Sequence, residues 1–299
     1  MNKNSTLAGH LACAAAYTIF GLNIVLCKDI TNSAVIPPNA LFTFRAAGAS
    51  ALFWLISLFL PKEKVEISDL PKIALASFLG LFLTQMSFLY ALKVTTSIDI
   101  SIISVVTPVF TMIFAAIFLK EPVSVAKSLG VTISMCGVLM LIFNSVTHGN
   151  GVDVTKPIGI VLMIVNTMSF AAYLGIFRPL IAKYNVVTFM KWMFLVSFVI
   201  SLPLSAKEIA GMDYGAVSGT VWAEVAYVVV FATFVAYFLI PFGQKRIRPT
   251  LVSMYTYLQP LIAAVISIFA GLDTLTWAKV FAAALVVCGV TLVNGSRMK

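Results

Sequence analysis

Apolar residues occur along this chain in long uninterrupted blocks, separated by short polar segments such as KEKVEISDLPK and KEPVSVAKS. A bilayer core about 30 Å thick requires roughly 20 apolar residues in a helix that rises about 1.5 Å per residue. The blocks have this length, so each is expected to cross a membrane once. We predict ten membrane-spanning helices, near residues 7–27, 39–60, 73–92, 97–119, 128–146, 157–177, 187–205, 222–243, 250–270 and 280–296.

Composition supports the same interpretation. Of the 299 residues, 61% are hydrophobic and 10% are charged, whereas a soluble domain carries about 25% charged residues. So few charges cannot cover a water-exposed surface, and the predicted fold class is therefore an all-α integral membrane protein. A cleaved signal peptide is not expected, because the first apolar block lacks a clear small-residue cleavage site and a second block follows at once.

Lysine and arginine residues give the chain a net charge of +9, and nearly all of them lie in the short loops. Thirteen of the twenty fall on one side of the predicted membrane and five on the other, while Arg45 and Lys191 lie within spans. Because cytoplasmic loops carry an excess of positive charge, both termini are predicted to be cytoplasmic. This distribution does not suit a nucleic-acid partner, which requires a basic patch on one face.

Cysteine and histidine residues do not indicate metal or redox chemistry. The four cysteines lie in or near apolar blocks without ligand spacing, and His10 and His148 stand alone in the sequence. We interpret the cysteines as packing residues and expect no cofactor and no metal. An intramembrane enzyme would need a nucleophile with a base, or a set of metal ligands, at one depth, and these residues do not supply such a set.

The second half of the chain repeats the first. A shift of 152 residues places CGVTLV at Cys288–Val293 on CGVLML at Cys136–Leu141, and Pro260 on Pro108. Further matched pairs are Lys127 with Lys279, Glu121 with Asp273, Phe20 with Phe170 (shift 150) and Arg45 with Lys191 (shift 146). We predict a first five-helix repeat over 1–147, a linker over 148–156 and a second repeat over 157–299. Because five is an odd number, the repeats are expected to be inverted, as in many secondary transporters.

Pro108 and Pro260 lie near the middle of the predicted fourth and ninth spans, at similar depth from opposite faces. A proline within a helix leaves the carbonyl four residues earlier without its donor, and these carbonyls belong to Ser104 and Thr256. A carbonyl left without a donor cannot face lipid, so we expect spans four and nine to flank a cavity near the midplane, with the prolines as hinges. The alternative is that both prolines only kink their helices for packing.

Polar residues within spans are costly and usually face the interior of the bundle. Each of them either lines the cavity or forms an ordinary interhelical hydrogen bond. The residues that we predict to line the cavity are Asn23, Gln85, Tyr90, Asp99, Ser104, Thr107, Asn166, Tyr173, Tyr237, Tyr255, Thr256 and Gln259.

Two charged residues within spans have alternative interpretations. Asp99 either complements the dipole at the start of its helix or binds a cationic group or a proton during transport. Arg45 either extends toward the membrane surface or pairs with a carboxylate of the substrate.

The chain resembles the ten-helix EamA branch of the drug/metabolite transporter superfamily over nearly its whole length. The resemblance rests on FGLN, Phe44-Arg45, VVTPVF…FLKEPVS and the paired CGV segments, with FAAY, TFVAY and YLQPLIAAVISI in the second copy. The chain departs from the family pattern at Phe20, where tryptophan often stands, at Asp99, where a small apolar residue is usual, and at Leu272-Asp273. The resemblance implies transport of a small metabolite without nucleotide hydrolysis.

We therefore predict a secondary transporter that exports small metabolites such as amino acids across a prokaryotic inner membrane, by alternating access around the midplane cavity. Its expected partners are a small-molecule substrate, the bilayer and a proton as coupling ion, and no oligomeric state is predicted. The alternatives are an uncoupled channel or facilitator, and a transporter of nucleobases or nucleotide sugars. Only Arg45 and Lys191 could meet phosphate within the membrane, which makes nucleotide sugars a weaker fit.

Overall fold

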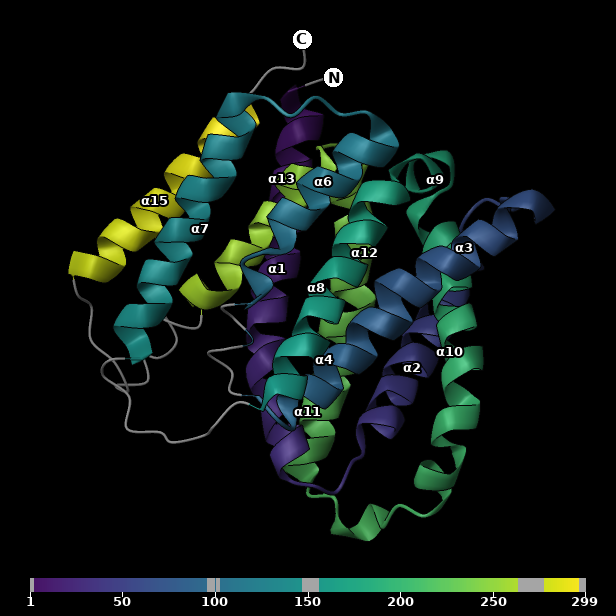
Figure 1. The fold of residues 1–299 in the computed structure, drawn as a ribbon. Coiled ribbons are helices and arrows are strands. Elements are labelled where there is room, and N and C mark those ends of the chain that lie inside the picture. Colours follow the sequence, from purple (N-terminus) through teal and green to yellow (C-terminus); the bar gives the residue numbers. More distant parts are fainter. Residues whose placement is uncertain (1–2, 96–99, 101–102, 147–155, 263–276, 296–299) are drawn as a thin grey trace.

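A computed structural model describes residues 3–95, 100, 103–146, 156–262 and 277–295 of this chain, and Figure 1 shows their arrangement as a helical bundle. Every regular element in these residues is helical. The first half contains α1 (Lys3–Asn32), α2 (Pro38–Ser57), η1 (Ile67–Asp69), α3 (Leu70–Ser77), η2 (Phe78–Leu83), α4 (Thr84–Leu92), α6 (Thr107–Leu119) and α7 (Val125–Val146). The second contains α8 (Pro157–Ile176), α9 (Arg178–Lys183), α10 (Val186–Ala210), η3 (Tyr214–Ala216), α11 (Gly219–Val229), η4 (Val230–Val235), α12 (Ala236–Gln244), α13 (Pro249–Met254), η5 (Tyr255–Tyr257) and α15 (Trp277–Gly295).

Six helical runs among the described residues are long and apolar enough to cross a bilayer. They are Asn4–Asn32, Pro38–Ser57, Ile67–Leu92, Pro157–Ile176, Val186–Ala210 and Gly219–Gln244. Shorter apolar helices cover Thr107–Leu119, Val125–Met140 and Val280–Val293. The predicted all-α membrane class agrees with this architecture, whereas the number of ten spans stays a prediction, since parts of spans four and nine lie outside the described residues.

Equivalent helices of the two halves run in opposite directions. Along α7 and α15, Gly130 packs against Val293, the Ser134 hydroxyl donates to the Val286 carbonyl at 3.1 Å, and Gly137 approaches Ala282. The partner number falls as the α7 number rises, so the two helices are antiparallel, and they lie side by side in Figure 1. Ser134 and Val286 are equivalent residues, 152 positions apart, and they touch each other. The pseudo-two-fold axis that relates the two halves therefore passes close to this contact.

The third and eighth spans share an irregularity that the repeat has duplicated. Each contains a six-residue π-helical stretch, Phe78–Leu83 in one and Val230–Val235 in the other, again 152 residues apart. In the third span the Thr84 hydroxyl donates to the Leu79 carbonyl at 2.7 Å. In the eighth, the Thr233 hydroxyl donates to the Val228 carbonyl at 2.7 Å. Such π-helical insertions are frequent at functional sites because they rotate the following residues relative to the preceding helix.

The fourth and ninth spans are interrupted rather than continuous, which corrects the expectation of prolines within unbroken helices. A turn at residues 105–106 precedes α6, and Pro108 occupies the first turn of that helix, where its missing N–H is tolerated. The Thr107 hydroxyl donates to the Ser104 carbonyl at 2.7 Å, so this carbonyl is satisfied locally. In the ninth span the 3₁₀ turn η5 follows α13, and Pro260 lies in the helical segment that begins after it.

We name the end of the bundle where α1 begins the inner end, after the predicted orientation, and the opposite end the outer end (top and bottom in Figure 1). A layer of aromatic side chains crosses the bundle between them, in which Tyr17, Phe194 and Tyr237 are buried and Phe20 is partly buried. Phe20 packs edge-on against Tyr17 and Tyr237, with ring centroids 5.8 and 5.6 Å apart, and Phe194 packs on Tyr237 at 5.7 Å.

Candidate functional site

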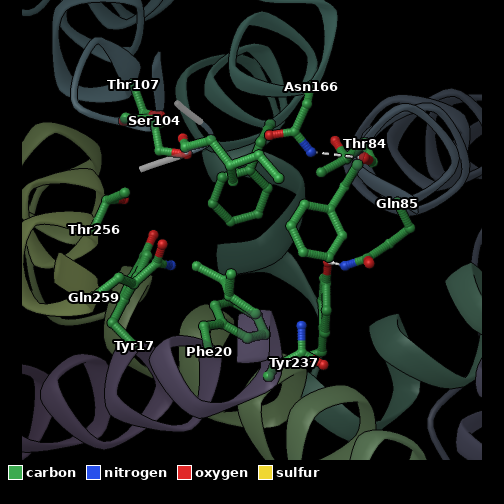
Figure 2. A pocket seen from close by; sticks show the side chains of 15 residues that line it. Tyr17, Phe20, Thr84, Gln85, Ser104, Thr107, Asn166, Tyr237, Thr256 and Gln259 are labelled. Atoms are coloured by element: carbon green, nitrogen blue, oxygen red, sulfur yellow. Dashed lines mark hydrogen bonds between the residues drawn. The ribbon is translucent and has the colours of Figure 1, made fainter. Parts of the chain in front are cut away.

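A cavity lined in part by Tyr17, Phe20 and Tyr237 of this aromatic layer lies where the two halves meet (Figure 2). Its wall is formed by α1, α4, the segment before α6, α8, α12 and the ninth span. Its volume of about 80 Å³ suits several waters or one small solute. The residues around it are Tyr17, Phe20, Asn23, Ile24, Thr84, Gln85, Phe88, Ile100, Ser104, Thr107, Asn166, Phe170, Tyr237, Thr256 and Gln259.

The described wall is polar but carries no charged side chain. Its four carboxamides come from Asn23, Gln85, Asn166 and Gln259, and each offers both a donor and an acceptor. Hydroxyl groups and phenylalanine rings complete the wall. This combination suits a solute that presents both hydrogen-bonding groups and an apolar surface.

Hydrogen bonds between helices hold several of these side chains in place. The Gln85 carboxamide donates to the Tyr237 hydroxyl, which joins the first half to the second. The Asn166 carboxamide donates to the Thr84 carbonyl at 2.6 Å, and both bonds are drawn in Figure 2. The wall is therefore a defined arrangement of polar groups that belong to both halves.

The Gln85 carbonyl oxygen of the wall is buried and has no hydrogen-bond partner among the described residues. The Tyr17 and Thr256 hydroxyls are also buried, and they interact with each other without forming a hydrogen bond of standard geometry. A buried polar group without a partner costs about 1–3 kcal/mol. Because all three belong to cavity-lining residues, a solute or water within the cavity is the natural partner for them.

Eight of the predicted residues line this cavity: Asn23, Gln85, Ser104, Thr107, Asn166, Tyr237, Thr256 and Gln259. Their predicted role in binding substrate is a separate matter and stays a prediction. Asp99 lies outside the described residues, next to Ile100 of the wall.

Three predicted tyrosines are placed away from the wall. Tyr90 lies toward the outer end, is 37% exposed, and donates its hydroxyl to Asn39 at 3.1 Å. Tyr173 is fully buried one turn beyond Phe170, where it packs on Gly80 within the π-helical stretch η2.

In a regular α-helix, Tyr255 would share a face with Gln259, four residues further on. It starts the 3₁₀ turn η5 instead, which advances by about 120° per residue rather than 100° and separates the two side chains. Its hydroxyl binds the His10 ring at 2.7 Å.

Comparison with known proteins identifies the family. The model of the EamA-like transporter family matches residues 7–143 and again residues 157–295. This chain belongs to the EamA-like transporter family. It is 22% identical to the uncharacterized transporter YetK of Bacillus subtilis, over 87% of this chain and 79% of that protein. An uncharacterized transporter of Archaeoglobus fulgidus is 23% identical over 96% of this chain and 99% of its own length. One chain in a solved crystal structure shares the fold, with a TM-score of 0.75 at 17% identity, and the match covers 98% of this chain and 96% of that one.

This EamA-like transporter is thus a multi-pass membrane protein built from two copies of one repeat, as its resemblance to the family predicted. The named members of the family are transporters, which confirms the prediction that the chain is not an enzyme. A small-molecule substrate and a surrounding lipid bilayer follow from membership of the family.

Several lining residues of this EamA-like transporter were not selected from its sequence. Thr84, Gln85 and Phe88 form one face of α4, but only Gln85 was chosen. Their spacing of i, i+1 and i+4 could have indicated from the sequence that all three residues lie on one face of the helix. The π-helical stretch just before them removes the constant 3.6-residue period on which such a face is normally traced.

Arg45 does not extend toward the membrane surface, which corrects one of the two interpretations offered for it. Its side chain is 1% exposed within the bundle, and its Nε donates to the Thr233 hydroxyl at 2.9 Å. The equivalent residue Lys191 instead places its ammonium group over the Trp54 ring, 4.7 Å from the centroid.

Proposed function

We propose that this EamA-like transporter is a secondary transporter that exports small metabolites such as amino acids across a prokaryotic inner membrane, with a proton as coupling ion. One observation carries the proposal: a cavity whose described wall is polar and without charged side chains, and which includes the unpartnered Gln85 carbonyl oxygen, lies where two antiparallel repeats meet. A site at the interface of inverted repeats is the arrangement that alternating access requires, because rocking one repeat against the other exposes the site to each side in turn.

The contacts between the halves differ at the two ends of the bundle. At the inner end, the Glu121 carboxylate binds Lys127 at 3.0 Å and Arg178 of the second half at 3.2 Å. Also at the inner end, Asp69 accepts hydrogen bonds at 2.7 Å from Lys183 and 2.8 Å from Tyr184, both in the second half.

At the outer end, no ion pair joins the two halves among the described residues. The Asn39 carboxamide donates to Glu208 at 3.0 Å, the hydroxyls of Thr43 and Ser205 lie 2.8 Å apart, and Glu224 interacts with Asp29, a second acid. We propose that the ion pairs and the aromatic layer close the cavity toward the inner end. This asymmetry supports an assignment to an outward-facing state, in which the inner ion pairs must open before solute can enter from the other side.

Pro108 and Pro260 have a place in this mechanism. Each follows an interruption of its helix beside the cavity, and the residues just before it contribute to the wall. We propose that the two interruptions are the hinges about which spans four and nine move, because backbone without continuous helical hydrogen bonds absorbs changes of φ and ψ at low cost.

The test is counterflow in proteoliposomes against a panel of labelled amino acids and nucleobases. We expect saturable exchange of one chemical class, driven by the unlabelled compound on the other side. Saturable exchange of nucleobases alone would change the substrate class while keeping the mechanism. Rapid, non-saturating leak without counterflow would replace the proposal with an uncoupled channel, which needs no closed inner end.

A further inference from the structure

Arg45 is a buried cation without an anionic partner in the part of the chain that the structure describes. Its Nε donates to Thr233, and a second guanidinium nitrogen lies 3.9 Å from the Cys27 sulfur, a long contact to a weak acceptor. The remaining nitrogen is buried and has no partner there. Glu224 acts electrostatically on the Cys27 thiol but forms no ion pair with Arg45 among the described residues.

Such an arrangement is costly unless the residue has a function. A charged side chain within a membrane protein is rare, faces the interior, and normally pairs with an anion or a ring. The repeat provides an internal comparison, because the equivalent Lys191 is partnered by the Trp54 ring. Arg45 has no ring contact of this kind among the described residues, although it is less exposed than Lys191.

Arg45 lies directly behind the wall of the cavity. One neighbour, Cys27, donates through its sulfur to the Asn23 side-chain oxygen at 3.3 Å, and Asn23 lines the cavity. The other neighbour, Thr233, precedes the cavity-lining Tyr237 by one helical turn on η4 and α12. A single layer of neutral side chains therefore separates the guanidinium group from the solute space.

We propose that the free edge of Arg45 is the anion subsite of this cavity, and that the transported solute carries a carboxylate. The inference rests on the proposed function and narrows its substrate class. The carboxylate would replace the 3.9 Å contact to Cys27, the weakest that the guanidinium group makes, and accept two parallel hydrogen bonds from it. The uncharged carboxamides and hydroxyls of the wall then hold the rest of the solute.

Two matched probes test the subsite without knowledge of the natural substrate. Benzoate and benzamide share a ring and a size but differ in charge, and sodium chloride at equal ionic strength controls for inorganic anions. We expect benzoate to raise the thermal unfolding midpoint of the purified protein by about 2 °C or more, and benzamide and chloride to leave it unchanged. Arg45→Gln should abolish the benzoate shift, whereas Lys191→Gln, which removes the equivalent cation, should keep it.

Loss of folding should not mimic this result, because Arg45→Gln removes an unpaired buried charge and should not lower the midpoint without ligand. Arg45→Lys provides a second test. It keeps the positive charge but loses the planar guanidinium group that donates two parallel hydrogen bonds, so the benzoate shift should fall by at least about half. Equal shifts with benzoate and benzamide, a benzoate shift that survives in Arg45→Gln, or an absent benzoate shift would each overturn the proposal. An equal shift with chloride would assign the subsite to an inorganic anion and overturn the carboxylate assignment.

Counterflow separates this inference from the proposed function. Wild-type protein should exchange L-phenylalanine, L-leucine or another acid of the panel at least about tenfold faster than the matching carboxamide, about 1.4 kcal/mol of discrimination, and Arg45→Gln should erase that preference. Exchange of acids and amides at equal rates would contradict the Arg45 subsite but leave the proposed transport function standing. A benzoate shift without counterflow of any panel member would support the subsite but contradict the proposed transport of these metabolites.

Discussion

Gln85 and Tyr237 occupy equivalent positions in the two repeats, 152 residues apart, and the Gln85 carboxamide donates a hydrogen bond to the Tyr237 hydroxyl across the cavity wall. Each residue is the second after a π-helical stretch that the repeat has duplicated. The bond therefore lies close to the axis that relates the halves, where relative motion of the repeats acts on it directly.

The first prediction concerns this pair. Gln85→Leu leaves the buried Tyr237 hydroxyl without its donor, and Tyr237→Phe leaves the carboxamide without its acceptor, so each should lower the free energy of unfolding by about 1 kcal/mol. The double variant should reveal a coupling energy of at least about 0.5 kcal/mol. Unfolding in sodium dodecyl sulfate measures stability, and counterflow measures transport.

The Ser77–Ser197 pair supplies the control for that prediction. These hydroxyls also join the two halves, 2.7 Å apart and buried, but neither residue lines the cavity. Ser77→Ala and Ser197→Ala should therefore cost stability while keeping the counterflow rate within about twofold, whereas the Gln85 and Tyr237 variants lose about tenfold. Equal transport losses in both sets would show that the Gln85–Tyr237 bond matters only for packing.

A second prediction concerns the ion pairs at the inner end. Glu121→Gln leaves Lys127, whose side chain is 2% exposed, without its carboxylate, and breaking such a buried pair costs about 3 kcal/mol or more. Glu66→Gln removes a carboxylate that is 61% exposed from Lys183 and should cost less than about 1 kcal/mol. Unfolding of the two variants side by side measures the difference, and similar costs for both would contradict the buried character of the Glu121 cluster.

A third prediction follows from the titration of Lys183, the last residue of α9. Hydrogen bonds to Asp69 and then Glu66 raise the pKa of Lys183 above its ordinary value of 10.5. A raised folded-state pKa contributes stability that is complete below pH 10.5 and is lost as the pH rises through the folded-state pKa. Because the side chain is 41% exposed, screening by solvent keeps this effect on stability small.

Unfolding at a series of pH values checks this expectation. Between about pH 9 and pH 12 the wild type should lose more stability than Lys183→Met, which lacks the titrating group. Curves that stay parallel over this range would show that the contact between Lys183 and Asp69 contributes nothing to the closed inner end.

A fourth prediction tests the hinges. Pro108→Ala and Pro260→Ala permit helical hydrogen bonds across the interruptions, so transport turnover should fall several-fold while substrate affinity changes little. Pro203, which lies within α10 on an exposed surface, provides the matched control, and Pro203→Ala should transport at the wild-type rate. Unchanged turnover in both Pro108→Ala and Pro260→Ala would remove the hinge role.

Sequence reasoning found the membrane class, the repeat and most of the polar wall because these depend on composition and on pairs of equivalent residues. Gln85 and Tyr237 were predicted as polar residues within spans, and the shift of 152 makes them equivalent positions. It did not find the local departures from α-helical geometry. The 3₁₀ turn at Tyr255 and the π-helical stretch before Thr84 each change the rotation per residue, and no 3.6-residue pattern records such a change.

The burial of Arg45 was the other property that could not be predicted from the sequence. The sequence showed a cation at Arg45 within a span, but whether it reaches the membrane surface depends on which helices surround it. The Thr233 hydroxyl that receives Arg45 comes from the other half of the chain, 188 residues away. Composition near Arg45 carries no information about such a distant partner.

The central claim is that the cavity between the repeats holds the transported solute. Counterflow of Thr256→Val and Thr132→Val tests it most directly, because the chemical change is identical at both sites. Thr256 presents a buried hydroxyl without a hydrogen bond of standard geometry on the cavity wall, whereas Thr132 lies exposed on α7 and donates to the Ser128 carbonyl at 3.0 Å. We predict that Thr256→Val lowers the exchange rate at subsaturating solute by about tenfold while Thr132→Val leaves it within about twofold of wild type. Wild-type exchange by folded Thr256→Val would contradict the claim.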